Sequence, residues 1–210
     1  MPKLKPATQN ARREHILDAA EQCFARTGFH RTTMHDICRL AGISPGALYV
    51  YFDSKEALIA GITERDRAEF ADQLARLAEA ADFMTAFKSL GEHYMQEDRA
   101  HKGPLCVEIG LESLRNPVVG EIFRRFDREV LDSFQKLFQR LQDEGRIAPA
   151  MDIPTVTTAF SVLADGVFWR NSVHPDFDRE RAMDAVFAMI QQLLNPVSSP
   201  LPSPDEVMSS

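Results

Sequence analysis

The sequence predicts an all-α fold, with a small helical head at the N-terminus and a larger helical domain after it. Three observations lead to this prediction. Residues that cap or end helices recur along the chain, residues 117–145 form a long amphipathic pattern, and no segment shows the strict alternation of apolar and polar residues that is typical of strands. With 210 residues, of which 44% are hydrophobic, the chain can bury a substantial core.

Residues 33–52 predict two short helices joined by a tight turn. Thr33 can cap the first helix, and Asp36, three residues later, completes a capping box. Gly42 ends this helix, because only glycine enters the left-handed conformation at low cost. Ser44 then caps the second helix almost at once. Two helices so close together must cross steeply, as they do in a helix-turn-helix.

The second of these helices has two different faces. Leu48 and Phe52 are four residues apart and belong in the core, whereas Tyr49 and Tyr51 point elsewhere. Gly46 costs roughly 1 kcal/mol relative to alanine inside a helix and less near its end, so its presence indicates a surface that packs closely against it. The structural alternative is a loose first turn made of common helix-end residues. Taken together, the pattern is typical of a surface that reads nucleic acid.

Residues 12 to about 58 resemble the DNA-binding domain of the TetR/AcrR family of transcriptional regulators. The matching segments are ILDAAEQCFARTGFHRTT, DICRLAGIS, PGALYVYF and SKEAL. The resemblance implies that Thr33 and Lys55 clamp phosphates. It also implies that Pro45, Gly46, Ala47 and Tyr49 lie in or beside the major groove and that Tyr51 touches the DNA backbone.

Elementary electrostatics supports these expectations. The helix starts at Thr33, Ser44 and Ser54 present unpaired N–H groups, which favour phosphates. The second helix has no Arg, Gln or Asn for a bidentate contact with a base, so sequence preference is left to Tyr49, to Arg39 or His35, and to DNA shape. The expected DNA contacts are therefore Thr33, Arg39, Ser44, Pro45, Gly46, Ala47, Tyr49, Tyr51 and Lys55.

Charge is distributed unevenly along the chain. Residues 1–55 hold eight basic and five acidic residues, a net charge of +3, whereas the remainder holds 16 basic and 26 acidic residues, a net charge of −10. Only one end of the protein is thus expected to meet a polyanion. Residues 1–13 are expected to form a flexible basic arm along the DNA.

After the head, capping residues, prolines and glycines mark further helices. The expected helices cover about 54–80, 82–99, 104–116, 117–145, 152–172 and 177–194. The predicted domains are 1–55 for DNA binding and 56–195 for effector binding and dimerisation. A Pro- and Ser-rich tail, 196–210, is expected to be disordered.

The family resemblance implies that the second domain dimerises through its last two helices. Their apolar residues are candidates for a four-helix interface with a second copy, or for an ordinary core: Phe160, Leu163, Val167, Phe187, Ile190 and Leu194. A homodimer would place two recognition helices about 34 Å apart, which suits successive major grooves of a palindromic operator.

The resemblance also implies an effector between the middle helices. The candidate ligand contacts are Phe83, Phe87, His93, Tyr94, Cys106, Ile109, Glu112, Phe126, Phe168 and Trp169, with Phe123, Glu108, Asp165 and Arg170 as further candidates. Most aromatic residues at helical spacing are simply core, so the same residues have a structural alternative. A Phe-rich lining favours a hydrophobic or aromatic small molecule, and a repressor released by that molecule is the expected function.

Other classes of function have weaker support. A metal or redox sensor would use His93, His101, Cys106 and Glu108, which lack any recognised ligand spacing. A helical scaffold would not explain the basic head. Enzyme motifs are missing, and no cofactor or metal is expected. Without a long apolar run or signal pattern, a cytoplasmic location and no membrane partner are expected.

Overall fold

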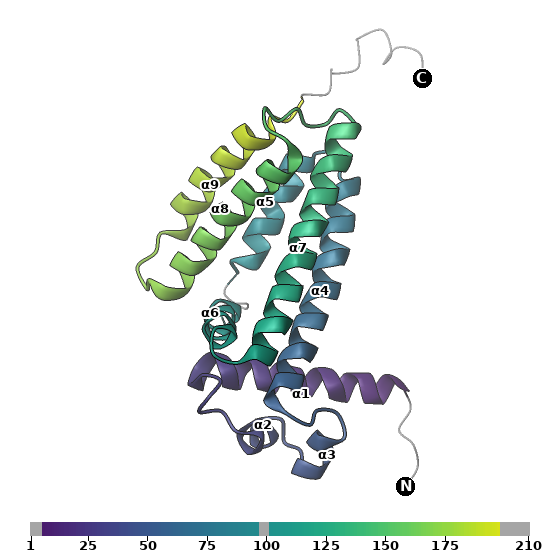
Figure 1. Cartoon of the computed structure of the whole chain (residues 1–210), viewed down its shortest axis with the longest axis vertical. Coiled ribbons are helices and arrows are strands. Elements are labelled where there is room, and N and C mark those ends of the chain that lie inside the picture. The colour runs from purple at the N-terminus through teal and green to yellow at the C-terminus, as the bar shows by residue number, and fades with distance from the viewer. Residues whose placement is uncertain (1–5, 97–100, 198–210) are drawn as a thin grey trace.

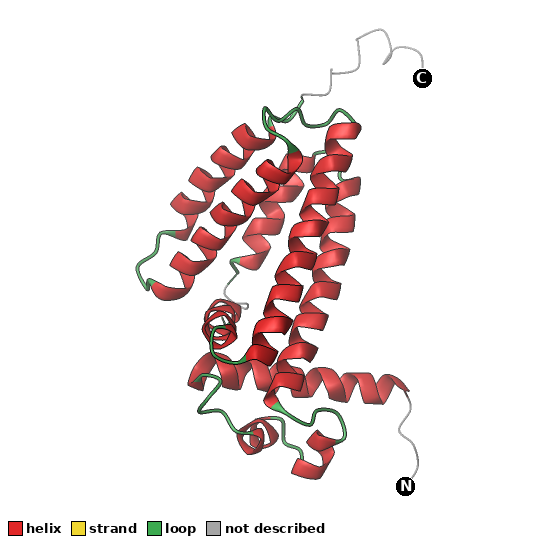
Figure 2. Ribbon diagram, viewed as in Figure 1, coloured by secondary structure: helices red, strands yellow, loops and turns green. Residues whose placement is uncertain are grey.

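A computed structural model of the chain describes residues 6–96 and 101–197. These residues form only α-helices, apart from one isolated antiparallel bridge between Ile147 and Pro196 (Figure 2). The helices are α1 (Pro6–Thr27), α2 (Met34–Leu40), α3 (Pro45–Tyr49), α4 (Lys55–Glu79), α5 (Phe83–Tyr94), α6 (Lys102–Ser113), α7 (Pro117–Asp143), α8 (Ile153–Val173) and α9 (Arg179–Leu194). Within the described residues, no helix has the length and apolar character needed to cross a membrane.

The helices form a head and a body (Figure 1). Helices α1, α2 and α3 make up the head at one end of the molecule. The long helices α4 and α7 run side by side away from it, and α5, α8 and α9 pack beside their far halves. Helix α6 lies lower, where it contacts α1, α7 and α8. It therefore stands between the head and the rest of the body.

The caps of the head helices form as the sequence predicts. Thr33 Oγ1 accepts the N–H of Asp36 at 3.1 Å, and the Asp36 carboxylate accepts the N–H of Thr33 at 3.0 Å. Gly42 has a φ of 62° and ends α2. The N–H of Ile43 then reaches back to Cys38 O at 3.0 Å, which satisfies one of the last carbonyls of the helix. These local bonds hold the turn between α2 and α3.

Three predicted boundaries were wrong. Helix α1 already begins at Pro6, so residues 6–13 are helical rather than a flexible arm, and residues 1–5 lie outside the described part of the chain. Helix α5 ends at Tyr94 instead of near 99. Helix α6 begins at Lys102, two residues before Pro104, because proline is tolerated anywhere in a first turn, where N–H groups lack helical partners. Of the tail, only residues 196 and 197 are described.

The buried side chains form two clusters, one at each end of the long helices. The first joins α1, α2 and α3 with Leu58, Ile59 and Ile62 of α4 and with residues of α6 and α7. The second joins the far half of α4 with α5, α7, α8 and α9 and is rich in phenylalanine, including Phe134 and Phe138. Because α4 and α7 contribute to both clusters, they connect the core of the head to the core of the body.

Candidate nucleic-acid interface and effector cavity

Helix α3 has one small exposed face and one face that is buried in the head. Leu48 is fully buried and Phe52 is 5% exposed, as the sequence predicts, whereas Tyr49 is 53% exposed. Ser44, Pro45 and Gly46 are also exposed, and Ala47 is half-buried. Apart from its two chain neighbours and the backbone of its own helix, nothing in the protein lies within 4 Å of the position that a Cβ at Gly46 would occupy. The close approach that Gly46 permits is therefore available to a partner, not used within the chain.

The other expected DNA contacts, on α2 and after α3, differ in how exposed they are and in whether they already have a partner within the chain. Thr33 is exposed at the start of α2, although its side chain is engaged in the capping box. Arg39 is exposed and forms an ion pair with Asp36. Tyr51 is half-buried and packs against the head cluster. Thr33 and Arg39 are thus exposed on the head although each has a partner within the chain, and Tyr51 has a structural contact as well.

Lys55 holds the loop that follows α1. Its ammonium donates a hydrogen bond to Phe29 O and lies 4.3 Å from the centroid of the Phe29 ring. Burial lowers the pKa of Lys55, although the nearby Glu56 and Glu112 oppose this shift. The side chain is placed at the N-terminus of α4, where a phosphate would also bind, but here it has a protein partner.

Two further basic residues accompany Arg39 on the head. Arg26 and Arg31 line a shallow surface hollow with Arg39, beside Thr27 and Leu40. The sequence showed them only as part of the positive excess of residues 1–55, because nothing in their spacing distinguishes them from solvated surface arginines. Their position adds positive charge beside the start of α2.

A cavity of about 310 Å³ lies in the body and is lined by residues of α4 to α9. Its lining is mainly apolar and aromatic: Phe70, Phe87, Tyr94, Phe126, Phe134, Phe160, Phe168 and Phe187. Ligand cavities of this size and character commonly hold small organic molecules. The charged residues in the lining are Asp66, Glu69, Lys88, Lys102 and Asp165.

An ion network at the head-side of the cavity reaches into α1. Lys102 Nζ lies 2.6 Å from Glu21 Oε1 and 2.8 Å from Asp66 Oδ1, and Arg65 also pairs with Glu21. Glu21 is 2% exposed. Burial alone would raise the pKa of Glu21, but Lys102, Arg65 and a hydrogen bond from His101 outweigh it and lower the pKa. The network connects the cavity to the head.

Comparison with known proteins matches both parts of this architecture. Residues 16–62 match the family model "Bacterial regulatory proteins, tetR family", and residues 96–195 match "BetI-type transcriptional repressor, C-terminal". The chain is 34% identical over 166 residues to the HTH-type transcriptional regulator UidR of Escherichia coli K12, covering 73% of this chain and 80% of that protein. The chain belongs to the TetR family of transcriptional regulators.

Solved structures of TetR-family regulators share the fold. The structure of Salmonella enterica GusR has a TM-score of 0.75 and 28% identity, covering 92% of this chain and all of that one. A SmeT–triclosan complex has a TM-score of 0.73 and 26% identity, covering 92% and 99%. Regulators of the family are not enzymes; they bind DNA operators, dimerise and respond to small-molecule effectors.

The cavity contains part of the predicted ligand set. It is lined by Phe87, Tyr94, Cys106, Phe126, Phe168 and Asp165. The lining does not include Phe83, His93, Ile109, Glu112 or Trp169, nor Phe123, Glu108 or Arg170. Phe83 is buried in the second cluster, Ile109 lies in the head cluster, and Trp169 is 52% exposed. The lining residues that sequence reasoning missed include Phe70 of α4, Phe134 of α7 and Phe187 of α9. Their meeting across the bundle is not visible in the pattern of any one helix.

The residues suggested for a metal or redox site are engaged separately. His101 Nε2 lies 3.1 Å from Glu21, and Glu108 accepts the N–H of Phe29 at 2.5 Å. Among the described residues, no group of three or more His, Cys, Asp or Glu side chains is placed to hold a metal ion. Cys106 lines the cavity, yet desolvation raises the pKa of its thiol to about 12. A thiol with so high a pKa is a poor nucleophile at neutral pH.

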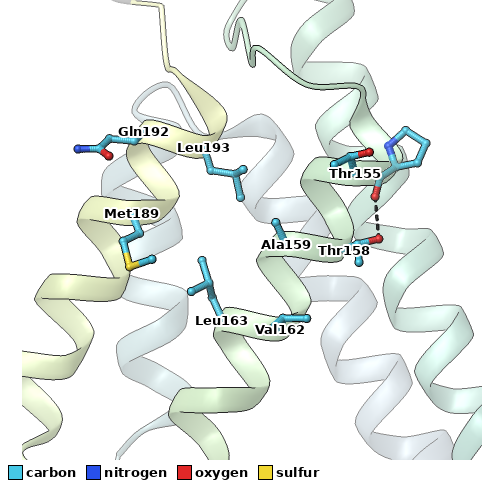
Figure 3. Close-up of a pocket in the computed structure, with 9 residues that line it drawn as sticks. Thr155, Thr158, Ala159, Val162, Leu163, Met189, Gln192 and Leu193 are labelled. Carbon is cyan, nitrogen blue, oxygen red and sulfur yellow. Dashed lines mark hydrogen bonds between the residues drawn. The ribbon is translucent and has the colours of Figure 1, made fainter.

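A second hollow, an open apolar groove, runs between α8 and α9 on the outside of the body (Figure 3). It is lined by Pro154, Thr155, Thr158, Ala159, Val162, Leu163, Met189, Gln192 and Leu193. Val162 is 65% and Met189 52% exposed. Of the six apolar residues that were candidates for a dimer interface or for an ordinary core, four belong to the core. Phe160, Val167, Ile190 and Leu194 are buried inside the chain, because they face the second cluster and the cavity.

Proposed function

We propose that this TetR-family protein is a repressor that leaves a palindromic operator when a hydrophobic or aromatic small molecule fills the cavity. The observation that carries the proposal is the aromatic cavity of about 310 Å³, built on the same helices that hold the head. The DNA contacts would be the exposed residues of α2 and α3 with Lys55 and the adjacent arginines. Acting on an operator would place the protein in the cytoplasm.

Helix α6 offers the most direct route from the cavity to the head. At its start, Lys102 faces the cavity and pairs with Glu21 of α1. Further along, Glu108 accepts the N–H of Phe29, and the buried Glu112 lies 2.7 Å from His30. A ligand that shifts α6 would therefore pull on the loop that Lys55 also holds. Helix α4, which is capped by Ser54 beside the head and contributes Asp66, Glu69 and Phe70 to the cavity wall, would be the second element that transmits the change.

The groove between α8 and α9 is the proposed dimer interface. Its exposed apolar residues would be covered by the same residues of a second copy, which gives a symmetric four-helix contact. Dimerisation would set the separation of the two α3 helices to about 34 Å, one turn of DNA. We assign DNA binding to residues 1–55, and effector binding and dimerisation to residues 56–195.

Fluorescence anisotropy with DNA from the gene's own upstream intergenic region tests the proposal. In excess nonspecific competitor, we expect specific binding that one member of a panel of hydrophobic compounds relieves. Rising salt should weaken binding steeply, because each neutralised phosphate contributes a log–log slope of about −0.9. Binding that is insensitive to salt would contradict the DNA model. Specific binding that strengthens with the compound would identify a corepressor and contradict ligand-induced release.

A further inference from the structure

The lysine at the start of α4 already uses its charge within the protein. Lys55 donates a hydrogen bond to Phe29 O, and its ammonium lies 4.3 Å from the centroid of the Phe29 ring. The carbonyl oxygen accepts a hydrogen of the ammonium, and the face of the ring attracts its charge. A DNA phosphate that binds Lys55 would have to replace these contacts. Phe29 thus offers the lysine an alternative to DNA.

Two carboxylates of α6 hold the loop around Phe29. Glu108 Oε1 accepts the N–H of Phe29 at 2.5 Å, and the same oxygen lies 3.0 Å from the position that a Cβ at Gly28 would occupy. Glycine at this position, with a φ of 82°, lets α6 approach the loop closely. The buried Glu112 lies 2.7 Å from His30 Nε2. Helix α6 therefore contacts Phe29 and both of its neighbours.

The loop is also closed by bonds of its own. Thr32 Oγ1 donates a hydrogen bond to Gly28 O at 2.7 Å and lies 2.7 Å from Thr27 Oγ1. The ring of Phe29 packs on that of Phe24, with 5.5 Å between the centroids. Bonds within the loop reduce its freedom to deform, so a displacement at its contacts with α6 should reach the carbonyl of Phe29.

Helix α6 is also part of the cavity wall, and it lies between the cavity and the head (Figure 1). Lys102 and Cys106, in its first half, line the cavity, whereas Glu108 and Glu112, in its second half, hold the loop. A helix of 12 residues tends to move as one unit, so a shift of its first half would also displace the second. Such a shift would change how well Phe29 O is placed to bind an ammonium.

We propose that Phe29 competes with DNA phosphate for Lys55 and that Glu108 and Glu112 are positioning residues that hold Phe29 in place. This role of Phe29 rests on the proposed function, because it takes Lys55 as a phosphate contact. A change at α6 that holds Phe29 more firmly lowers DNA affinity, and a change that frees Phe29 raises it. This form of regulation operates within one chain and needs no change in the spacing of two heads.

A double-mutant cycle in the full-length protein provides the test. Glu108→Ala removes the acceptor of the Phe29 N–H, and Lys55→Met removes the charge but keeps a long side chain. Because a phosphate contact carries no sequence information, fluorescence anisotropy with a random-sequence duplex at low salt measures it without the operator. We expect Glu108→Ala to tighten binding about fivefold when Lys55 is present, and by less than about twofold in the Lys55→Met background.

Two further variants separate the position of Phe29 from other effects. Asp18→Asn removes an exposed carboxylate of α1 that pairs with Arg65, so it controls for lost negative charge and should change binding by about twofold or less. His30→Ala breaks the contact with Glu112 from a side chain that is 65% exposed. It should tighten binding in the same Lys55-dependent way, although it removes a basic group. If circular dichroism shows Glu108→Ala to be unfolded, His30→Ala decides.

The reactivity of Lys55 gives a second measurement, without DNA. Acetylation by N-hydroxysuccinimidyl acetate, mapped by mass spectrometry, should be at least about twofold faster at Lys55 in Glu108→Ala than in the wild type, relative to the exposed Lys136 of α7. Unchanged or weaker DNA binding in the folded variants, or equal tightening with and without Lys55, would overturn the role of Phe29. The proposed function is judged separately: equal affinity for upstream and random DNA would contradict operator binding even if the Lys55 cycle behaves as expected.

Discussion

Tyr49 and Val50 are neighbours on the head surface, and both are exposed, at 53% and 79%. Only Tyr49 follows Pro45 and Gly46 by four and three residues, so it shares their face of α3. We expect Tyr49→Ala to weaken operator binding by about 1–3 kcal/mol, because it removes one contact with DNA. Anisotropy titrations measure this change, with Val50→Ala as the matched control. Equal losses in both variants would show that α3 does not approach DNA by this face.

Replacing the buried Glu21 should lower the stability of the fold. Its buried carboxylate pairs with Lys102 and Arg65, so Glu21→Gln leaves both cations short of a partner. We expect a loss of about 3 kcal/mol in the free energy of unfolding at pH 7, as for other broken buried ion pairs. Asp18→Asn removes the exposed partner of Arg65 and should cost about 1 kcal/mol or less. Urea unfolding at one fixed protein concentration compares the two variants.

The contribution of Glu21 to the free energy of unfolding depends on pH, and the direction of this dependence follows from the shift of the Glu21 pKa. The pKa is lowered in the folded state from its ordinary value of 4.5, so the folded state binds this proton less readily than the unfolded state. The stabilisation is therefore fully present above pH 4.5 and is lost as the pH falls through the folded-state pKa. We expect the stability difference between wild type and Glu21→Gln to shrink below that pH. A constant difference down to pH 3 would show that the charge of Glu21 is not its source.

Single residues also mark the limit of prediction from the sequence. The buried positions Leu48 and Phe52 were predicted, because helical spacing alone assigns their face. Lys55 was expected to meet phosphate, and its contact with Phe29 depends on a loop 26 residues away. Ile109 and Glu112 were expected beside a ligand but face the head. Helix periodicity defines an inward face, but it does not say which helix that face meets.

At the scale of helices, local chemistry predicted most of the starts. Thr33, Ser44, Ser54, Asp82 and Asp152 all cap helices through side-chain oxygens, and the sequence identified each of them. The start of α6 was missed because its N-cap, His101, makes no side-chain capping bond. Without a local signal, this boundary is set by packing, including the contact of Lys102 with Glu21.

Glycines on two helices lead to opposite predictions. A Cβ at Gly61 of α4 would lie 2.9 Å from both Leu17 Cδ2 and Phe52 Cε1, which are buried and cannot move away. We expect Gly61→Ala to destabilise the head by about 1–3 kcal/mol through overpacking. A Cβ at Gly110 of α6 would meet nothing within 4 Å beyond its chain neighbours and its own helix backbone, so Gly110→Ala should stabilise the protein by about 0.5–1 kcal/mol through helix propensity. Thermal unfolding of both variants measures these changes in stability. If Gly61→Ala left the stability unchanged, α1 and α4 would pack less tightly than the distances at Gly61 indicate.

For the whole molecule, function depends on surfaces that a single chain leaves open. The groove between α8 and α9 exposes apolar residues along both helices (Figure 3). The family resemblance implied that these two helices dimerise, and their most apolar residues, such as Phe160 and Ile190, were candidates for that contact or for the core; the chain buries both of them itself. The most apolar positions go to the core, so the proposed dimer contact would use the flanking residues that stay exposed, such as Val162 and Met189.

The final prediction concerns this outer face. Val162→Arg should leave the fold of one chain intact, because the side chain is 65% exposed, but it would place two like charges in a symmetric interface. We expect sedimentation velocity to show monomers at concentrations where the wild type is dimeric. Val118→Arg, at a 57% exposed position at the start of α7, should remain a dimer. Operator affinity of Val162→Arg should fall toward that for a half-site, because two heads held at a fixed spacing bind as one unit. If the variant becomes monomeric yet keeps full operator affinity, dimer spacing does not control DNA binding, and effector release must act within each head through α6.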